Sequence, residues 1–258
     1  MYFLQPEFRP LSPPKRIVSL VPSQTELLYH LGLEEQTVGI TKFCVHPEPW
    51  FRQKMRIGGT KSLDIDKIKA LQPDLIIANK EENVKEQVES LIDVAPVWVS
   101  DISTLAEALA MIGAIGEITG TREKAVAITE TINQGFSGLT AGGKGLNTLY
   151  LIWKNPWMSV GNDTFIHDLM TRCGLRNCCG NQQRYPELSE QDILLKKPEL
   201  VLLSSEPFPF KEKHIASLQT LLPDSRIILV DGEMFSWYGS RLMYAAAYLK
   251  QLLEEALP

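Results

Sequence analysis

Aromatic and charged side chains gather in four segments that the sequence pattern predicts to be loops. They are Phe43, His46, Trp153, Asn155, Trp157, Tyr185, Glu233, Phe235, Trp237, Tyr238 and Arg241. Aromatic faces bury a large area at a low cost in side-chain entropy. A guanidinium at Arg241 could hold a carboxylate or phosphate through two parallel hydrogen bonds. These residue types predict a binding site for a large, partly planar ligand.

Each of these side chains also has a structural interpretation. An aromatic residue in a loop often anchors that loop by local packing, and Arg241 could form a salt bridge with Glu233. The four histidines lack the spacing of metal ligands. His46 is the histidine in a predicted binding loop, where it could occupy the open axial position of a chelated metal. Packing and ligand contact therefore stay open as alternatives at these positions.

The sequence shows no motif of an enzyme. It contains no nucleophile elbow, P-loop or dinucleotide fingerprint. Asp163 and Glu233 could form a carboxylate pair, but nothing in the sequence determines their separation. We therefore expect no catalytic residues, no resident cofactor and no dedicated metal ligands.

Composition excludes some partners and leaves the compartment open. The net charge of −5 over 258 residues gives no reason to expect nucleic acid. The first residues lack the basic and apolar regions of a secretory signal. The chain is therefore cytoplasmic as written, or periplasmic or at the cell surface if a leader was removed. We expect reduced cysteines, although Cys173 could pair with Cys178 or Cys179.

Two stretches lying 125 residues apart, 63–77 and 188–202, follow the same sequence pattern. Each has a polar N-cap, Asp64 or Ser189, followed by a short helix and a Pro-acid-Leu step into an apolar strand. Asp192 could complete a capping box with Ser189. Repetition over such a distance predicts two similar lobes, and a protein of two lobes usually binds its ligand in the cleft between them.

Apolar strands alternate with helices on each side of a long helical stretch, which indicates parallel sheets covered by helices. The fold class is α/β, with two Rossmann-like lobes with central parallel sheets joined by one long backbone helix. We expect an N-terminal lobe at 1–119, a connecting helix at 120–143 and a C-terminal lobe at 144–258. A single stiff helix between the lobes argues against a large hinge closure.

Local signals predict several element boundaries. Ser23 or Thr25 could cap the first helix, and Asn162 or Asp163 the first helix of the second lobe. Residues 43–50, with two prolines, are expected to be an irregular loop, and Gly239 to open the last helix.

The segments 16–27, 64–77, 159–166, 185–189 and 197–201 resemble, in order and spacing, the class III periplasmic binding proteins. The resemblance covers about residues 15–255. This family comprises helical-backbone receptors for metal chelates such as cobalamin, siderophores and haem, and the cobalamin-binding group is the most similar. The resemblance implies a non-catalytic, monomeric receptor that delivers a corrinoid, ferric siderophore or haem to an ABC-type permease.

The resemblance also implies roles for individual residues. Phe43, Tyr185, Glu233 and Arg241 fall near ligand-contacting positions, whereas two tryptophans of the cobalamin group are replaced here. Those replacements are Thr60 and Asn79. The alternatives are a cytoplasmic chelate-binding sensor or storage protein, and a two-lobed enzyme.

In the family, one acidic residue near the start of each repeated helix docks on permease arginines. Asp66 occupies that position in the first lobe. The second lobe has Gln191 there, between Glu190 and Asp192. The three acids are therefore the candidates for permease docking, and helix capping is the alternative role of Asp192.

Overall fold

The computed structural model describes residues 1–5, 7–8, 10–139 and 142–256. The chain divides into two compact units. Unit 1 comprises Met1–Ile102, Ala106–Thr131 and Trp237–Arg241, and unit 2 comprises Ser103–Leu105, Ile132–Ser236 and Leu242–Pro258. The predicted ranges 1–119, 120–143 and 144–258 stay predictions, and they include positions 6, 9, 140, 141, 257 and 258, which lie outside the described residues.

Unit 1 is built on a mainly parallel sheet with the strand order β1-β8-β7-β2-β3-β4. Its strands are β1 (Tyr2–Phe3), β2 (Ile17–Ser19), β3 (Thr37–Ile40), β4 (Met55–Arg56), β7 (Leu75–Asn79) and β8 (Val97–Ser100), and a small antiparallel pair is formed by β5 (Gly58–Gly59) and β6 (Ser62–Leu63). The pairs among β2, β3, β4, β7 and β8 are parallel, as the alternation of strands and helices predicted. The edge strand β1 is antiparallel to β8, and the sequence pattern did not reveal it.

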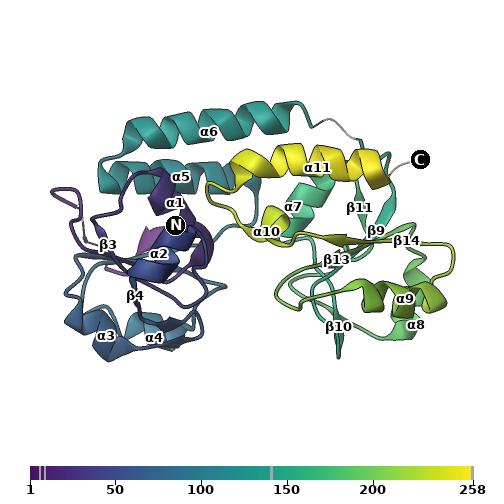
Figure 1. Ribbon diagram of the computed structural model, residues 1–258, viewed down its shortest axis with the longest axis horizontal. Coiled ribbons are helices and arrows are strands. Elements are labelled where there is room, and N and C mark those ends of the chain that lie inside the picture. Colours follow the sequence, from purple (N-terminus) through teal and green to yellow (C-terminus); the bar gives the residue numbers. More distant parts are fainter. Residues whose placement is uncertain (6, 9, 140–141, 257–258) are drawn as a thin grey trace. The chain divides into compact units, whose positions relative to one another are not determined.

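The helices of unit 1 are α1 (Pro22–His30), α2 (Glu48–Gln53), α3 (Ile65–Ala70) and α4 (Lys85–Glu89). Two longer helices follow along the chain, α5 (Leu105–Thr119) and α6 (Arg122–Ser137). Helix α6 begins in unit 1 and ends in unit 2, so it joins the two units along the chain (Figure 1).

Unit 2 contains a parallel sheet with the order β11-β9-β13-β14. Its strands are β9 (Asn147–Leu151), β11 (Arg176–Asn177), β13 (Leu200–Ser204) and β14 (Arg226–Val230), and β10 (Trp157–Met158) pairs with β12 (Glu187–Leu188) in an antiparallel ladder. The helices are α7 (Phe165–Arg172), α8 (Glu190–Lys196), α9 (Glu212–Leu221), α10 (Glu233–Ser236) and α11 (Leu242–Ala256). Apolar side chains of β9, β13 and α9 form its core, among them Leu149, Val201 and Leu218.

The sequence repeat corresponds to a repeated backbone arrangement, one copy in each unit. Asp64 and Ser189 are the N-caps of α3 and α8, and each side chain accepts a hydrogen bond from the third backbone N–H of its helix. Gln72 and Lys197, again 125 positions apart, both have a left-handed φ of 45° just before the proline. Such a conformation is uncommon for a residue with a Cβ, so its occurrence at matching positions confirms that the repeat is structural.

The end of each repeated helix is also bonded to the start of an inner strand of its sheet, β2 in unit 1 and β9 in unit 2. Arg16 Nε donates to the Leu71 carbonyl at 2.8 Å, at the end of α3. Asn147 Nδ2 donates to the carbonyls of Lys196 and Lys197, at the end of α8, at 2.7 Å and 3.0 Å. These bonds satisfy carbonyl groups that a helix end leaves without intrahelical partners.

Several boundary predictions were wrong for local reasons. The N-cap of α1 is Val21, without a side-chain hydrogen bond, because Pro22 occupies the first turn. The N-cap of α7 is Thr164, since Asp163 Oδ1 instead accepts a hydrogen bond from Arg184 N at 2.6 Å.

Two further boundaries differ from the prediction. The segment expected to be an irregular loop, 43–50, contains the start of α2, with a proline in its first turn, where the missing N–H costs nothing. The last helix begins at Leu242 and not at Gly239.

Candidate functional site

In unit 1, a polar residue lies at the carboxyl end of each of four neighbouring parallel strands. Ser19, Asn79 and Ser100 are the last residues of β2, β7 and β8, and Thr41 follows β3 directly. All four side chains are buried. The carboxyl ends of parallel strands meet at one edge of a sheet, where α/β proteins place their ligand-binding loops. This edge is therefore the candidate site of unit 1.

A hydrogen-bond network shapes the loop that follows β7. Asn79 Nδ2 donates to the Ser100 carbonyl at 3.0 Å, while its Oδ1 accepts from the backbone of Glu81 at 2.8 Å. Asn83 Nδ2 donates to the Thr60 carbonyl at 3.1 Å. Asn79 and Thr60 are thus buried parts of this polar network.

The segment Trp237–Arg241 packs on unit 1 although most of its chain neighbours belong to unit 2. A Cβ at Gly239 would lie 2.4 Å from the Ser23 carbonyl oxygen, so a side chain at this position would clash with α1. Ser240 Oγ lies 2.9 Å from His30 Nδ1, at the other end of α1. These contacts bring three predicted site residues, Trp237, Tyr238 and Arg241, to unit 1.

Arg241 forms a two-pronged ion pair with Glu26 of α1. Its Nε and Nη2 lie 3.0 Å and 2.7 Å from the two carboxylate oxygens, and the side chains are only 11% and 9% exposed. The Arg241 guanidinium also lies over the Trp237 ring, 4.8 Å from its centre. Glu26 is therefore a partner of this guanidinium that the sequence did not indicate, and the pairing with Glu233 stays a prediction.

Phe43 and His46 lie on the loop between β3 and α2. Phe43 is 51% exposed, and Lys42 Nζ lies 5.2 Å from the centre of its ring. His46 is half-buried and meets the edge of Trp237 at a ring distance of 5.7 Å. Phe43 therefore offers an accessible aromatic face, and His46, on the same loop, is held by an aromatic contact.

In unit 2 the loop after β9 carries Trp153 and Asn155, whereas Trp157, which was predicted to lie in a loop, is the first residue of β10. Trp153 is 39% exposed and meets the edge of Phe208 at 5.6 Å, and Asn155 is exposed with a φ of 66°. Trp157 is 8% exposed and stacks parallel to Phe210 within the core. Trp153 is thus an accessible aromatic side chain at the carboxyl end of β9, whereas Trp157 packs internally.

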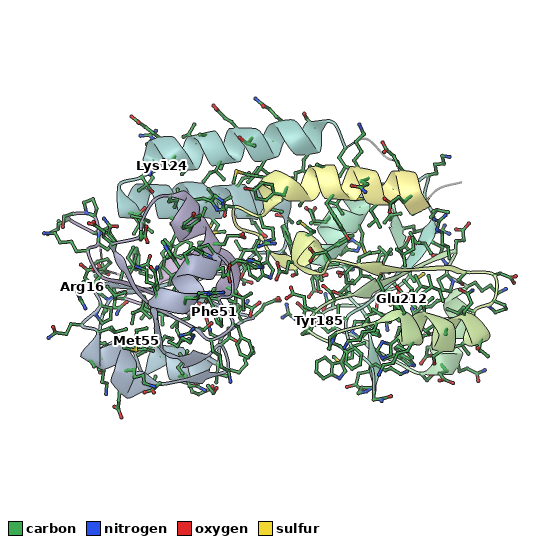
Figure 2. The ribbon with its side chains drawn as sticks, viewed as in Figure 1. Arg16, Phe51, Met55, Lys124, Tyr185 and Glu212 are labelled. Carbon is green, nitrogen blue, oxygen red and sulfur yellow. The ribbon has the colours of Figure 1, made fainter. Side chains whose placement is uncertain are left out.

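Tyr185, Glu233 and Phe235 occupy different environments. Tyr185, labelled in Figure 2, is half-buried on the loop before α8, and the Arg184 guanidinium lies 5.7 Å from its ring centre. Glu233 is half-buried at the start of α10. Phe235 is fully buried and packs against Tyr150 at 5.1 Å. Its contacts are those of a core residue.

An aromatic group that sequence reasoning missed lies beside Trp153. Phe208, Phe210 and His214 pack edge to face at ring distances between 4.7 Å and 5.4 Å. Burial lowers the pKa of His214, and the nearby charges of Lys154 and Lys213 lower it further. The position of Phe208 and Phe210 soon after the strand at 200–204 was a signal that could have indicated them.

The predicted docking acids lie on the first turns of α3 and α8. Asp66 and Glu190 are exposed. Asp192 Oδ2 accepts hydrogen bonds from Ser189 N at 2.8 Å and from Ser189 Oγ at 2.6 Å, while Asp192 N donates to Ser189 Oγ. These bonds form the expected capping box and lower the pKa of the Asp192 carboxyl.

The cysteines and the candidate metal ligands form no cluster. Cys44, Cys173, Cys178 and Cys179 are free thiols, and burial raises the pKa of Cys173 and Cys178 to about 12. Among the residues described, no group of three or more His, Cys, Asp or Glu side chains is placed to hold a metal ion. No helix within the described ranges has the length and apolar character needed to cross a membrane.

The architecture and the polar strand ends define a class of ligand-binding protein. Residues 17–222 match the family described as "Periplasmic binding protein". The chain belongs to this family, which consists of binding proteins and not of enzymes. The match confirms the resemblance to class III receptors and the α/β fold of two units with parallel sheets joined by a helix.

Two curated proteins are similar over most of their length. The vitamin B12-binding protein of Pectobacterium carotovorum is 25% identical over 255 residues, covering 95% of this chain and 90% of its own. An uncharacterised ABC transporter substrate-binding lipoprotein of Bacillus subtilis, YvrC, is 24% identical over 260 residues. The alignment covers 95% of this chain and 81% of YvrC.

Two solved structures share the fold. The periplasmic vitamin B12 binding protein BtuF of Vibrio cholerae has a TM-score of 0.81 at 22% identity, covering 95% of this chain and 98% of its own. The periplasmic haem-binding protein RhuT of Roseiflexus has a TM-score of 0.81 at 19% identity. The superposition covers 95% of this chain and 99% of RhuT.

Proposed function

We propose that this protein is a receptor for a metal chelate, either a corrinoid, a ferric siderophore or haem, which it delivers to an ABC-type permease. The named relatives that bind vitamin B12 or haem support this ligand class. The observation that carries the proposal is the presence of accessible aromatic side chains, Phe43 and Trp153, on loops at the carboxyl ends of parallel strands. Such faces suit a planar macrocycle or an aromatic chelating group.

The ligand-contacting residues are proposed from accessibility. Phe43, His46, Trp153, Asn155 and Tyr185 are exposed or half-buried on these loops, and Glu233 is half-buried as well. The more buried candidates have internal contacts, and their proposed role is to support the loops. These are Trp157, Phe235, Trp237, Tyr238 and Arg241.

A titration against cobalamin, cobinamide, haem and ferric siderophores, followed by absorbance or tryptophan fluorescence, tests the ligand class. We expect one of these chelates to bind with a Kd below about 1 μM, equivalent to about −8 kcal/mol. Phe43→Ala and Trp153→Ala should each weaken that binding about ten-fold. Tyr244→Ala, which removes an aromatic side chain that is 52% exposed on α11, serves as the matched control.

The ligand proposal fails if every chelate binds more weakly than about 10 μM, about −7 kcal/mol. Equal losses in Tyr244→Ala and in the loop variants would also count against the assignment of the loops.

We propose that Asp66 and Glu190 contact arginines of the permease. Both carboxylates are exposed at the starts of the repeated helices α3 and α8. The Asp192 carboxylate is already held by Ser189, so its proposed contribution to docking is secondary. Exposed opposite charges mainly speed association and orient the partners.

Charge reversal of Asp66 and Glu190 together tests this docking. We expect the Asp66→Arg/Glu190→Arg variant to lose transport and permease affinity while its chelate affinity stays unchanged. Glu130→Arg/Glu254→Arg, which reverses one exposed acid in each unit, is the control with the same change in net charge. Unchanged transport in the docking variant would refute the role of these two acids.

The place of action and the oligomeric state follow from the same proposal. Two of the named relatives are periplasmic proteins and a third is a lipoprotein, and we propose that this receptor also works outside the cytoplasmic membrane. We further propose that it acts as a monomer. Cell fractionation of the natively expressed gene product and light scattering of the purified protein test these two points, and a cytoplasmic product would favour the sensor or storage function.

A further inference from the structure

A hollow of about 600 Å³ lies in unit 2, and part of its lining, Gly180 and Asn181, belongs to the connection between β11 and β12 that also carries Tyr185. Its lining includes His167 and Thr171 of α7, Arg176 of β11, Asn181 and Lys196. Arg176 pairs with Asn147, the first residue of β9, and Lys196 ends α8 ahead of β13. The charged groups therefore lie towards the amino ends of the sheet strands, whereas Trp153 lies beyond their carboxyl ends.

The lining is rich in cationic groups and hydrogen-bond donors. It contains a guanidinium, an ammonium, an imidazole and an asparagine amide, and none of its residues is Asp or Glu. Neither Arg176 nor Lys196 forms an ion pair with any residue that the structure describes. The Asp192 carboxylate, one turn earlier on α8, feels the charge of Lys196 without forming an ion pair with it. Cations grouped around a hollow attract anions.

The His167 ring is held so that it presents a donor. Asn177 Oδ1 accepts the Cys179 backbone N–H at 2.9 Å, which determines the orientation of the Asn177 amide. Asn177 Nδ2 then donates to the Val160 carbonyl at 2.9 Å and to His167 Nδ1 at 3.1 Å. Because Nδ1 accepts, the proton of the neutral ring lies on Nε2, and Nε2–H is the donor left for a ligand.

The Lys196 ammonium is positioned by two neutral acceptors. Its Nζ donates to the Cys178 carbonyl at 3.0 Å and to Gln182 Oε1 at 3.4 Å. An ammonium has three donors, so one N–H remains. The lysine is thus placed at the hollow without having its charge neutralised by these partners.

We propose that this hollow binds a small molecule that carries an oxyanion, a phosphate or a carboxylate, through Arg176, Lys196 and His167 Nε2–H. Hydrogen bonds between ionised donors and oxyanions are the strong ones in proteins. The proposal does not depend on the chelate-binding function, because Arg176, Lys196 and His167 are not among the proposed chelate contacts.

Titration of the ¹⁵N-labelled whole protein with inorganic phosphate, and separately with succinate and citrate, tests the site at low salt. We expect saturable shifts of the Asn177, Cys178 and Asn181 amides, with a Kd of about 1 mM or below for the better class of anion. If the amide shifts saturate at a lower concentration of phosphate than of succinate or citrate, the site recognises phosphate. The reverse order would identify carboxylate as the recognised group.

Arg176→Gln and Lys196→Gln should each weaken that binding about ten-fold or more. Lys250→Gln removes an exposed lysine of α11 and is the control for net charge, with an expected change below about two-fold. Arg176 is exposed, so its variant is expected to keep the native urea midpoint even where Lys196→Gln lowers it. The proposal is overturned if no anion gives saturable shifts up to about 20 mM, or if Lys250→Gln weakens binding as much as Arg176→Gln.

Discussion

At the scale of single residues, Arg241 shows what the sequence can predict about a side chain and what only the folded structure reveals. Its residue type and its position in an aromatic loop correctly marked it as a guanidinium with a specific partner. One partner is Glu26, 215 residues earlier in the chain. No local pattern encodes a pairing at such a sequence separation, so only the folded chain could reveal it.

The first prediction concerns this ion pair. Glu26→Ala should lower the free energy of unfolding by about 3–5 kcal/mol, because it removes a buried carboxylate that forms two hydrogen bonds with the Arg241 guanidinium. Urea unfolding followed by circular dichroism measures the change. The matched control is Arg52→Ala, which breaks an exposed pair with Glu48 (74% and 69% exposed) and should cost less than about 1 kcal/mol.

A double variant separates the charge from the packing. Replacing both partners by apolar residues, Glu26→Leu and Arg241→Met, should recover part of the loss, since neither charge then remains buried alone. A Glu26→Ala variant as stable as the Arg52→Ala control would contradict the assignment.

The second prediction concerns pH and His214. Burial holds the His214 pKa below its ordinary value of 6.5, so the unfolded chain takes up this proton at a higher pH than the folded chain. The stability linked to this residue is therefore fully present above about pH 6.5 and is lost as the pH falls through the lower, folded-state pKa. His214→Asn, which retains an acceptor for the Lys211 N–H, should flatten the decline in urea midpoint between about pH 6.5 and pH 5.

An NMR titration of the His214 ring provides the independent measurement. A titration midpoint of the ring at or above about pH 6.5 would contradict the prediction. So would a decline in stability between about pH 6.5 and pH 5 that is as steep in His214→Asn as in the unaltered protein, because His214 would then not cause the pH dependence.

At the scale of elements, the repeat was the most reliable part of the sequence. The caps Asp64 and Ser189 and the Asp192 capping box could be predicted because each depends on residues within three positions. The cap of α7 could not, because Asp163 is drawn to the backbone of Arg184, which lies 21 positions away. Local motifs are predictable when no distant group competes for the same side chain.

The third prediction follows from the α8 cap. Ser189→Ala should lower the free energy of unfolding by about 1 kcal/mol, because Asp192 N then loses the oxygen that accepts its hydrogen bond. Gln191→Ala, a neighbouring exposed position outside the cap, should have little effect. Equal unfolding midpoints for these two variants would argue against the cap. Docking experiments at this helix should therefore use Glu190 and leave the Asp192 cap intact.

At the scale of the whole molecule, the alternation of strands and helices predicted two α/β units with parallel sheets. The short edge strand β1 and the packing of Trp237–Arg241 on unit 1 were not predictable. Both depend on contacts between distant parts of the chain and not on periodicity. The same holds for the candidate site. The residue types predicted which segments are rich in aromatic side chains, but they could not predict that Trp153 is exposed and Trp157 is buried.

The fourth prediction links ligand binding to the stability of the whole molecule. A chelate that binds the native protein at 100 times its Kd should raise the free energy of unfolding by about 2.7 kcal/mol. A ten-fold loss of affinity in Phe43→Ala or Trp153→Ala should reduce that gain by about 1.4 kcal/mol at the same ligand concentration. Urea unfolding with and without the chelate measures both quantities, with Tyr244→Ala as the control that should keep the full gain.

Because Phe43 belongs to unit 1 and Trp153 to unit 2, the two variants test each unit's loop separately. A gain that survives in both variants would mean that the chelate binds elsewhere on the molecule.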